Sequence, residues 1–186
     1  MRLVKHAQKF ISDHITEGSI VLDLTSGNGH DSLYLAKTVG EQGKLFAVDI
    51  QKKAIQATKE LLSAENCLGQ TRFILSCHTK FPDIIPRKVK GKANAIMLNL
   101  GYLPKGDHQI TTKPETTIAG ISYAYEWLAP EGVMTIIAYR GHSGGQRENL
   151  AVSKLISDQK WYCEVELGNE KDTSPILYMI RKLRRD

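Results

Sequence analysis

The chain has 186 residues, of which 41 % are hydrophobic and 24 % are charged, a composition typical of one globular domain. No apolar run approaches the roughly 20 residues of a membrane-spanning helix, and the N-terminus lacks the apolar core of a signal peptide, so a cytoplasmic protein is expected. The net charge of +5 permits a polyanionic partner without requiring one. Basic clusters at 87–92 and 181–185, taken alone, read as solvated surface.

The cysteines and histidines indicate neither a disulfide framework nor a metal centre. Cys67, Cys77 and Cys163 form no CxxC pair, and their odd number favours reduced thiols. The six histidines are scattered, and no two of them have HxxxH spacing. We therefore expect no metal cofactor.

Short apolar runs that read as buried strands alternate with segments of helical periodicity along nearly the whole chain. Strands are expected at 19–24, 44–49, 72–76, 93–100, 132–139, 161–167 and 176–182. Helices are expected at 30–39, 52–65, 114–128 and 145–159, and the proline-punctuated stretch 78–92 is expected to be irregular.

This alternation indicates an α/β fold with a parallel sheet covered by helices on both faces. The last two strands are separated by GNEKDTSP (168–175), which is too short for a crossover helix, so they should be antiparallel neighbours. The prediction is a single domain over 1–186 with a Rossmann-like, seven-stranded, mostly parallel sheet and an antiparallel last strand.

The stretch DLTSGNGHD (23–31) connects the first expected strand to the first expected helix. Gly27 and Gly29 allow positive φ angles and close approach of the backbone to a ligand, and the helix that follows offers unpaired N–H groups. Asp49 ends the second strand, where its carboxylate can accept hydrogen bonds from ribose hydroxyls. Ligands of doubly wound sheets bind beyond the carboxyl ends of the strands, so this loop is a candidate nucleotide site.

Two ligand classes fit the loop: a nicotinamide or flavin dinucleotide, and S-adenosylmethionine (SAM). The dinucleotide fingerprint requires Gly or Ala where this chain has Ser32. Carboxylates at Asp23 and Asp31 suit a sulfonium or ammonium group and repel a pyrophosphate. An inserted antiparallel last strand is the usual mark of class I methyltransferases, so SAM is favoured; a tight turn with solvated acids is the structural alternative. The expected cofactor-binding residues are Asp23, Thr25, Gly27, Asn28, Gly29, Asp31, Asp49, Gln51, Cys77 and His78.

Two further loops leave strands at the same edge. Asn99 and Tyr102 have the spacing of the Asp/Asn-Pro-Pro-aromatic motif of amino-group methyltransferases, although Leu100 and Gly101 replace the prolines. A neutral Asn oxygen can accept a hydrogen bond from an amine without stabilising the ammonium form, and a Tyr ring can stack on the target base, so both are expected catalytic residues. The glycine-rich loop RGHSGGQRE (140–148) is expected to approach a ligand or RNA phosphate. The expected RNA-binding residues are Leu103, Lys105, Arg140, His142 and Arg147.

Taken together, these motifs resemble one family across nearly the whole chain. They are DLTSGNGHD, AVDIQ (47–51), NLGYLPKGDH (99–108), the GHSGG loop and SPIL (174–177). They resemble the bacterial tRNA 5-(aminomethyl)-2-thiouridine methyltransferases, long labelled rRNA methylases. The resemblance implies SAM as methyl donor, a tRNA anticodon arm as substrate and methylation of the exocyclic amine of the modified wobble uridine. A homodimer would enlarge the limited surface with which so small a domain grips an anticodon arm.

Three alternatives stay open. An rRNA methyltransferase would share all these features, and methyl transfer to tRNA and rRNA transcripts would separate the two. A small-molecule N-methyltransferase needs no positive surface and would show salt-insensitive kinetics. A non-enzymatic nucleotide-binding module would bind SAM without turnover.

Overall fold

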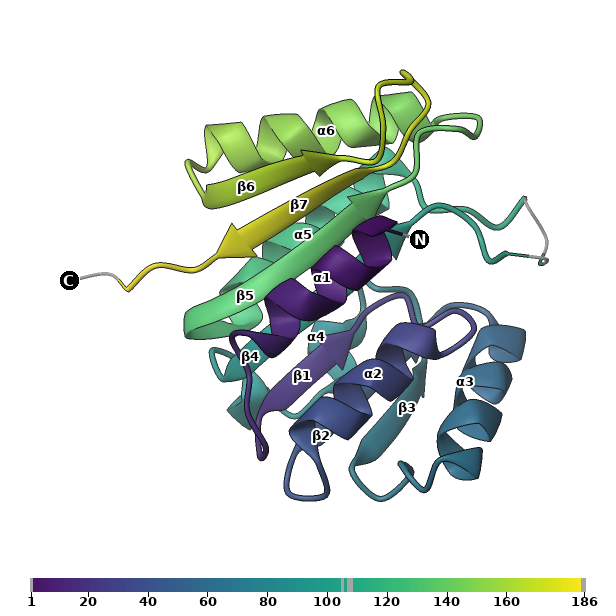
Figure 1. Ribbon diagram of the computed structural model, residues 1–186, viewed down its shortest axis with the longest axis vertical. Helices are drawn as coiled ribbons and strands as arrows, with labels where there is room; N and C mark the ends of the chain where they lie inside the picture. Colours follow the sequence, from purple (N-terminus) through teal and green to yellow (C-terminus); the bar gives the residue numbers. More distant parts are fainter. Residues whose placement is uncertain (1, 105, 107–108, 185–186) are drawn as a thin grey trace.

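A seven-stranded sheet between two layers of helices forms the protein, as seen in a computed structural model that describes residues 2–104, 106 and 109–184 (Figure 1). The strand order is β3-β2-β1-β4-β5-β7-β6. β7 pairs antiparallel with both β5 and β6, and the other neighbouring strands are parallel. The predicted fold class is confirmed, including the antiparallel pairing of the last two strands.

The strands are β1 (Ile20–Asp23), β2 (Lys44–Asp49), β3 (Thr71–Leu75), β4 (Ala93–Leu100), β5 (Leu128–Ala138), β6 (Tyr162–Leu167) and β7 (Ile176–Arg181). The helices are α1 (Arg2–Ser12), α2 (His30–Val39), α3 (Lys52–Ala64), α4 (Phe81–Ile84), α5 (Pro114–Trp127) and α6 (Gly145–Asp158), with a 3₁₀ turn η1 (Arg87–Val89). α1 was not expected from the sequence, and the stretch expected to be irregular contains α4 and η1. Within the described residues, no helix has both the length and the apolar character needed to cross a membrane.

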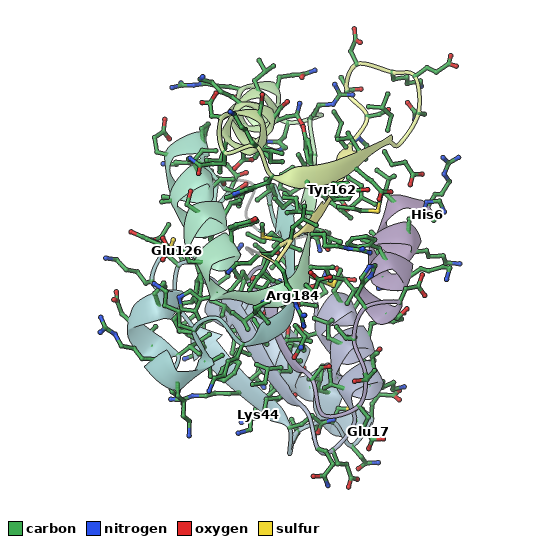
Figure 2. The ribbon with its side chains drawn as sticks, turned by 90° about the vertical axis from the view of Figure 1, so that its left-hand side faces the viewer. His6, Glu17, Lys44, Glu126, Tyr162 and Arg184 are labelled. Atoms are coloured by element: carbon green, nitrogen blue, oxygen red, sulfur yellow. The ribbon has the colours of Figure 1, made fainter. Side chains whose placement is uncertain are left out.

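Alternate residues of the central strands contribute to two separate hydrophobic cores. In β4, Ile96 and Leu98 pack in the core with side chains of α4, α5 and α6, whereas Met97 packs with side chains of α1, α2 and α3. Figure 1 shows α1 and α2 in front of the sheet and α5 behind it. In Figure 2, turned by 90°, His6 of α1 and Glu126 of α5 lie on opposite sides of the molecule. Burial on both faces explains why these strands read as continuous apolar runs.

The first helix is fixed to the sheet by a narrow apolar stripe. Ala7 and Ile11 lie one turn apart and are fully buried, and the helix contacts β5, β7 and α2. Arg2 also binds Glu166 of β6 at 2.9 Å, but this exposed pair contributes little to stability. The N-terminal end of α1 lies near the carboxyl ends of the parallel strands (Figure 1).

A buried carboxylate fixes the turn between β1 and α2. Asp23 is fully buried, and its Oδ2 accepts a hydrogen bond from the Ser32 hydroxyl at 2.6 Å while Oδ1 accepts one from the Thr25 N–H at 3.2 Å. Burial, together with the nearby charge of Asp31, raises the pKa of Asp23 to about 7. An unfolded Asp loses its proton near pH 4, so the folded chain retains a proton here that the unfolded chain has lost.

Asp23→Asn is expected to remove one pH-dependent contribution to stability. From about pH 4 to about pH 7 the proton on Asp23 belongs to the folded state, so the wild type should lose about 1 kcal/mol per pH unit relative to the variant. The amide keeps an oxygen acceptor and a similar shape but does not titrate. Urea unfolding of both proteins across this range measures the difference. A stability difference that stays constant with pH would contradict the raised pKa.

Candidate functional site

A cavity of about 760 Å³ opens at the carboxyl ends of the parallel strands. Its volume suits a small-molecule ligand. The loops that follow β1 and β4 both contribute, and the strand order reverses between these two strands, where doubly wound sheets bind their ligands. Twelve predicted site residues line it: Thr25, Gly27, Asn28, Asp31, Asp49, Gln51, Cys77, His78, Asn99, Tyr102, Leu103 and His142.

Two predicted cofactor residues lie behind the cavity wall. Asp23 is buried beneath the loop, where it holds Thr25 and Ser32 as described above. Gly29 is the N-cap that precedes α2 and has φ of 85°, and a Cβ at this position would lie 2.7 Å from the Cα of Thr58 in α3. Both residues therefore shape the loop, and neither lines the cavity.

The predicted RNA-binding arginines make contacts within the protein outside the cavity lining. The Nε of Arg140 donates to the carbonyl oxygen of Ser174 at 2.5 Å, which holds the loop between β6 and β7. Arg147 is 79 % exposed and lies 3.4 Å from Glu115. Lys105 lies outside the described residues.

Asp49 joins the loops that follow β1 and β2. Its Oδ2 accepts a hydrogen bond from the N–H of Gly27, and its Oδ1 accepts one from the N–H of Gln51, both at 2.9 Å. Burial raises the pKa of Asp49, and these backbone donors oppose the rise. Gly27 has φ of 53°, a conformation that favours glycine, and it lines the cavity. A carboxylate oxygen has room for a second donor, so Asp49 can also accept hydrogen bonds from a ligand.

The polar corner of the cavity centres on Asn99, the penultimate residue of β4. Its backbone N–H donates to the Thr25 hydroxyl at 2.7 Å, and its Nδ2 donates to Oδ2 of Asp31 at 2.6 Å. Because a carboxylate only accepts, the NH₂ group must face Asp31 and Oδ1 must face away from it. Oδ1 is buried and has no hydrogen-bond partner among the described residues. Leaving such an acceptor unpaired costs about 1–3 kcal/mol, which is a sign of a functional acceptor.

Two aromatic rings bring the loops after β4 and β5 together at the cavity. The rings of Tyr102 and His142 meet edge to face, with centroids 5.7 Å apart and planes at 81°. Tyr102 is 38 % exposed, so its ring is accessible to a ligand that enters the cavity. Nε2 of His142 is buried, and no partner for it occurs in the described part of the chain.

His78 reaches the cavity from the loop after β3. Burial lowers the pKa of His78, so its ring is neutral at neutral pH. The ring packs so closely on α5 that a Cβ on Gly120 would lie 2.4 Å from its Cδ2. Cys77 precedes it and also lines the cavity.

The sequence analysis missed two groups that shape this cavity. Gln8 of α1 donates from Nε2 to Oδ1 of Asp31 at 2.7 Å. Glu148 of α6 is 2 % exposed, and its carboxylate accepts hydrogen bonds from the hydroxyls of Thr112 and Thr117 at 2.8 and 2.5 Å. The Thr112 hydroxyl in turn accepts the N–H of Gly101 at 2.8 Å, which closes the base of the 101–112 loop. The threonine-rich run 111–117 was the available signal for the second group.

The described residues include no group of three or more His, Cys, Asp or Glu side chains that could hold a metal ion.

Comparisons with known proteins agree with this architecture. The profile of the family described as "Putative rRNA methylase" matches residues 45–181. A structure titled "putative rRNA-methylase" from Clostridium thermocellum superposes with a TM-score of 0.89 at 36 % identity, covering 97 % of each chain. A "putative methyltransferase" from Streptococcus mutans, solved in complex with SAH, superposes with a TM-score of 0.85 at 29 % identity, covering 98 % of this chain and 99 % of that one.

A curated relative from Arabidopsis thaliana, "tRNA (mnm(5)s(2)U34)-methyltransferase, chloroplastic", is 32 % identical over 184 residues. The match covers 90 % of this chain, and the chain spans 65 % of the length of that relative. The family profile covers well over half of the chain, and the matching structures share the whole fold. This chain therefore belongs to the family described as "Putative rRNA methylase" and has the Rossmann-like fold of SAM-dependent methyltransferases.

Proposed function

We propose that this chain is a SAM-dependent tRNA methyltransferase. In this proposal it N-methylates the aminomethyl group of 5-aminomethyl-2-thiouridine at the wobble position, giving 5-methylaminomethyl-2-thiouridine. The observation that carries the proposal is the buried Oδ1 of Asn99, an acceptor that has no partner in the described residues and that suits an amine N–H. The choice of tRNA is supported by the 32 % identity to the Arabidopsis relative, whose name specifies this uridine.

The residues at the ends of β1, β2 and β3 fit SAM. Asp49 offers a carboxylate for ribose hydroxyls, and Gly27, which has no side chain of its own, offers backbone in the cavity lining. The neutral ring of His78 suits a place beside the adenine. When bound, SAM supplies an electrophilic methyl group on a sulfonium, and in-line displacement then depends mainly on how the acceptor is held.

Holding the acceptor also means binding it without its extra proton. An alkyl ammonium has no lone pair with which to attack, so the site must favour the neutral amine. Leu24, Leu103 and Ile110 give the cavity apolar walls, which disfavour a charged group. Asn99 is neutral and its oxygen accepts an N–H, so it orients the amine without a negative charge of its own.

RNA would have to reach the cavity at the carboxyl edge of the sheet. Lys113 lines the cavity, and the exposed Arg147 lies on the first turns of α6, which begins at the loop after β5. The basic cluster 87–92 precedes β4, whose eight residues separate the cluster from the cavity by roughly 25 Å. Lys90 of that cluster also pairs with Glu126 at 2.7 Å. In this proposal, Lys113 and Arg147 contact the RNA and the basic cluster 87–92 does not.

Asp49→Ala is expected to weaken SAM binding by roughly 1–3 kcal/mol, because the ribose hydroxyls lose a charged acceptor and Gly27 loses its anchor. Calorimetry measures this affinity. Asp13→Ala is the matched control, since it removes a surface carboxylate that pairs with Lys9 far from the cavity. Unchanged affinity in Asp49→Ala would remove Asp49 from the cofactor site, and tight NADH binding by the wild type would overturn the choice of SAM.

Asn99→Ala is expected to lower kcat about 10- to 100-fold while changing SAM affinity much less, because orientation is lost at the reacting centre. Asn94→Ala is the control on the same strand: Asn94 accepts the N–H of Ile20 at 2.9 Å at the opposite end of β4. That variant should lose stability and keep its kcat. Equal losses of kcat in the two variants would show that Asn99 acts through the fold alone.

The reaction itself is tested with matched RNA substrates. The wild type should methylate tRNA that carries 5-aminomethyl-2-thiouridine at the wobble position and leave the same tRNA with unmodified uridine untouched, as read by nucleoside mass spectrometry. An rRNA transcript in parallel tests the activity that the family description names. Methyl transfer to a ring carbon or a ribose hydroxyl, or equal transfer to both tRNAs, would contradict the amine as acceptor.

A further inference from the structure

We infer that Gln8 of α1 is a positioning residue for the proposed methyl transfer. It acts through Asp31 to hold the Asn99 amide in the orientation that presents Oδ1 to the substrate amine. The inference rests on the proposed function and adds α1 to the machinery of the site. The matched region of the family profile begins at residue 45, so it contains neither Gln8 nor Asp31.

The three side chains form one continuous hydrogen-bonded chain. Gln8 Nε2 donates to Asp31 Oδ1 at 2.7 Å, and Asn99 Nδ2 donates to Asp31 Oδ2 at 2.6 Å. Each carboxylate oxygen therefore receives one N–H donor, and the two donors together fix the plane of the carboxylate. Asp31 is 7 % exposed, so little water is at hand to replace either donor.

The three residues joined by these hydrogen bonds lie on secondary-structure elements that are themselves held in place by packing. Gln8 follows the fully buried Ala7, and Ile11, one turn further on, is also fully buried, so the backbone of α1 is held against the sheet. Asp31 lies in the first turn of α2. Asn99 lies in β4 between two paired strands. A side chain that bridges such supports restricts its partner more than a contact between two loops would.

Gln8 itself is absent from the residues that line the cavity, and its hydrogen bond to Asp31 is the route by which we expect it to act on the reaction. An Asn amide has nearly the same shape when its oxygen and nitrogen are exchanged, and its neighbours decide its orientation. A carboxylate held in one plane selects the orientation with NH₂ inward and Oδ1 outward. Donation to a charged acceptor also polarises the amide and makes Oδ1 a better acceptor.

The experiment is a double-mutant cycle of Gln8→Met and Asn99→Ala. Methionine has a length similar to glutamine and no N–H donor. Gln8→Met should lower kcat for methyl transfer to the aminomethyl-bearing tRNA about tenfold and leave SAH affinity and tRNA KM nearly unchanged. In the Asn99→Ala background the same change should cost little further, because the residue through which Gln8 acts has gone.

Gln56→Met is the matched control. Gln56 on α3 also donates from Nε2 to a carboxylate, that of Glu60, at 2.7 Å, but the pair is exposed. This variant should keep wild-type kcat. If Gln8→Met folds poorly, Gln8→Asn replaces it, because the shorter amide keeps its polarity but cannot span the same distance; it should show the same loss of kcat.

The outcomes separate the inference from the proposed function. Unchanged kcat in the Gln8 variants, additive losses in the double variant, or a fall in SAH affinity as large as the fall in kcat would overturn the role of Gln8 and leave the reaction intact. Absence of methyl transfer to the aminomethyl-bearing tRNA by the wild type would overturn the proposed function, and the role of Gln8 with it.

Discussion

The carboxylate of Asp31 is the contact on which the rest of the site depends. It sits in the first turn of α2 and receives one N–H from α1 and one from β4, so three elements distant in sequence meet at one group. An acid at a helix N-terminus is also favoured by the helix dipole. Its charge also destabilises the ionised form of Asp23 and so contributes to the raised pKa of that residue. The loop between β1 and α2 is therefore organised from both sides by carboxylates, Asp23 beneath it and Asp31 beside the cavity.

The strands, the fold class and most of the cavity lining could be predicted from the sequence because their signals are local. A strand buried on both faces is apolar along its buried stretch, as at 95–98 in β4, and a parallel arrangement brings the loops after β1, β2 and β4 to one edge. Once those loops share an edge, Asp49 and Asn99 must lie near one another. The composition of each loop then indicates the ligand chemistry.

The position of α1 and the contacts that it and α6 make at the site depend on tertiary packing, which short sequence patterns do not determine. α1 is strongly amphipathic, with Leu3, Ala7 and Ile11 buried on one face, so the sequence carried a signal for this helix that was overlooked; its place across β5 and β7 follows from the tertiary fold. The bond from Gln8 to Asp31 depends on that placement. Asp23 and Asp31 look equivalent in the sequence, yet the pleat of β1 turns the first beneath the loop while the first turn of α2 brings the second to the cavity. The pairing of Glu148 was missed because its threonine partners lie more than 30 residues away in the sequence, although the threonine-rich run 111–117 was a visible signal.

The identity of residue 99 follows from its neighbour. A carboxylate in place of the Asn99 amide would lie about as close to Asp31 as the present 2.6 Å contact, and two such carboxylates cannot both be ionised. They would share one proton, and whenever that proton lay on Asp31 the charged carboxylate of residue 99 would face the proposed amine and hold it as ammonium. The amide satisfies Asp31 with an N–H and still offers a neutral acceptor on its other side. The acceptor that meets the substrate is therefore oriented by Asp31 of α2. Asp31 is in turn held by Gln8 of α1, a residue that does not line the cavity.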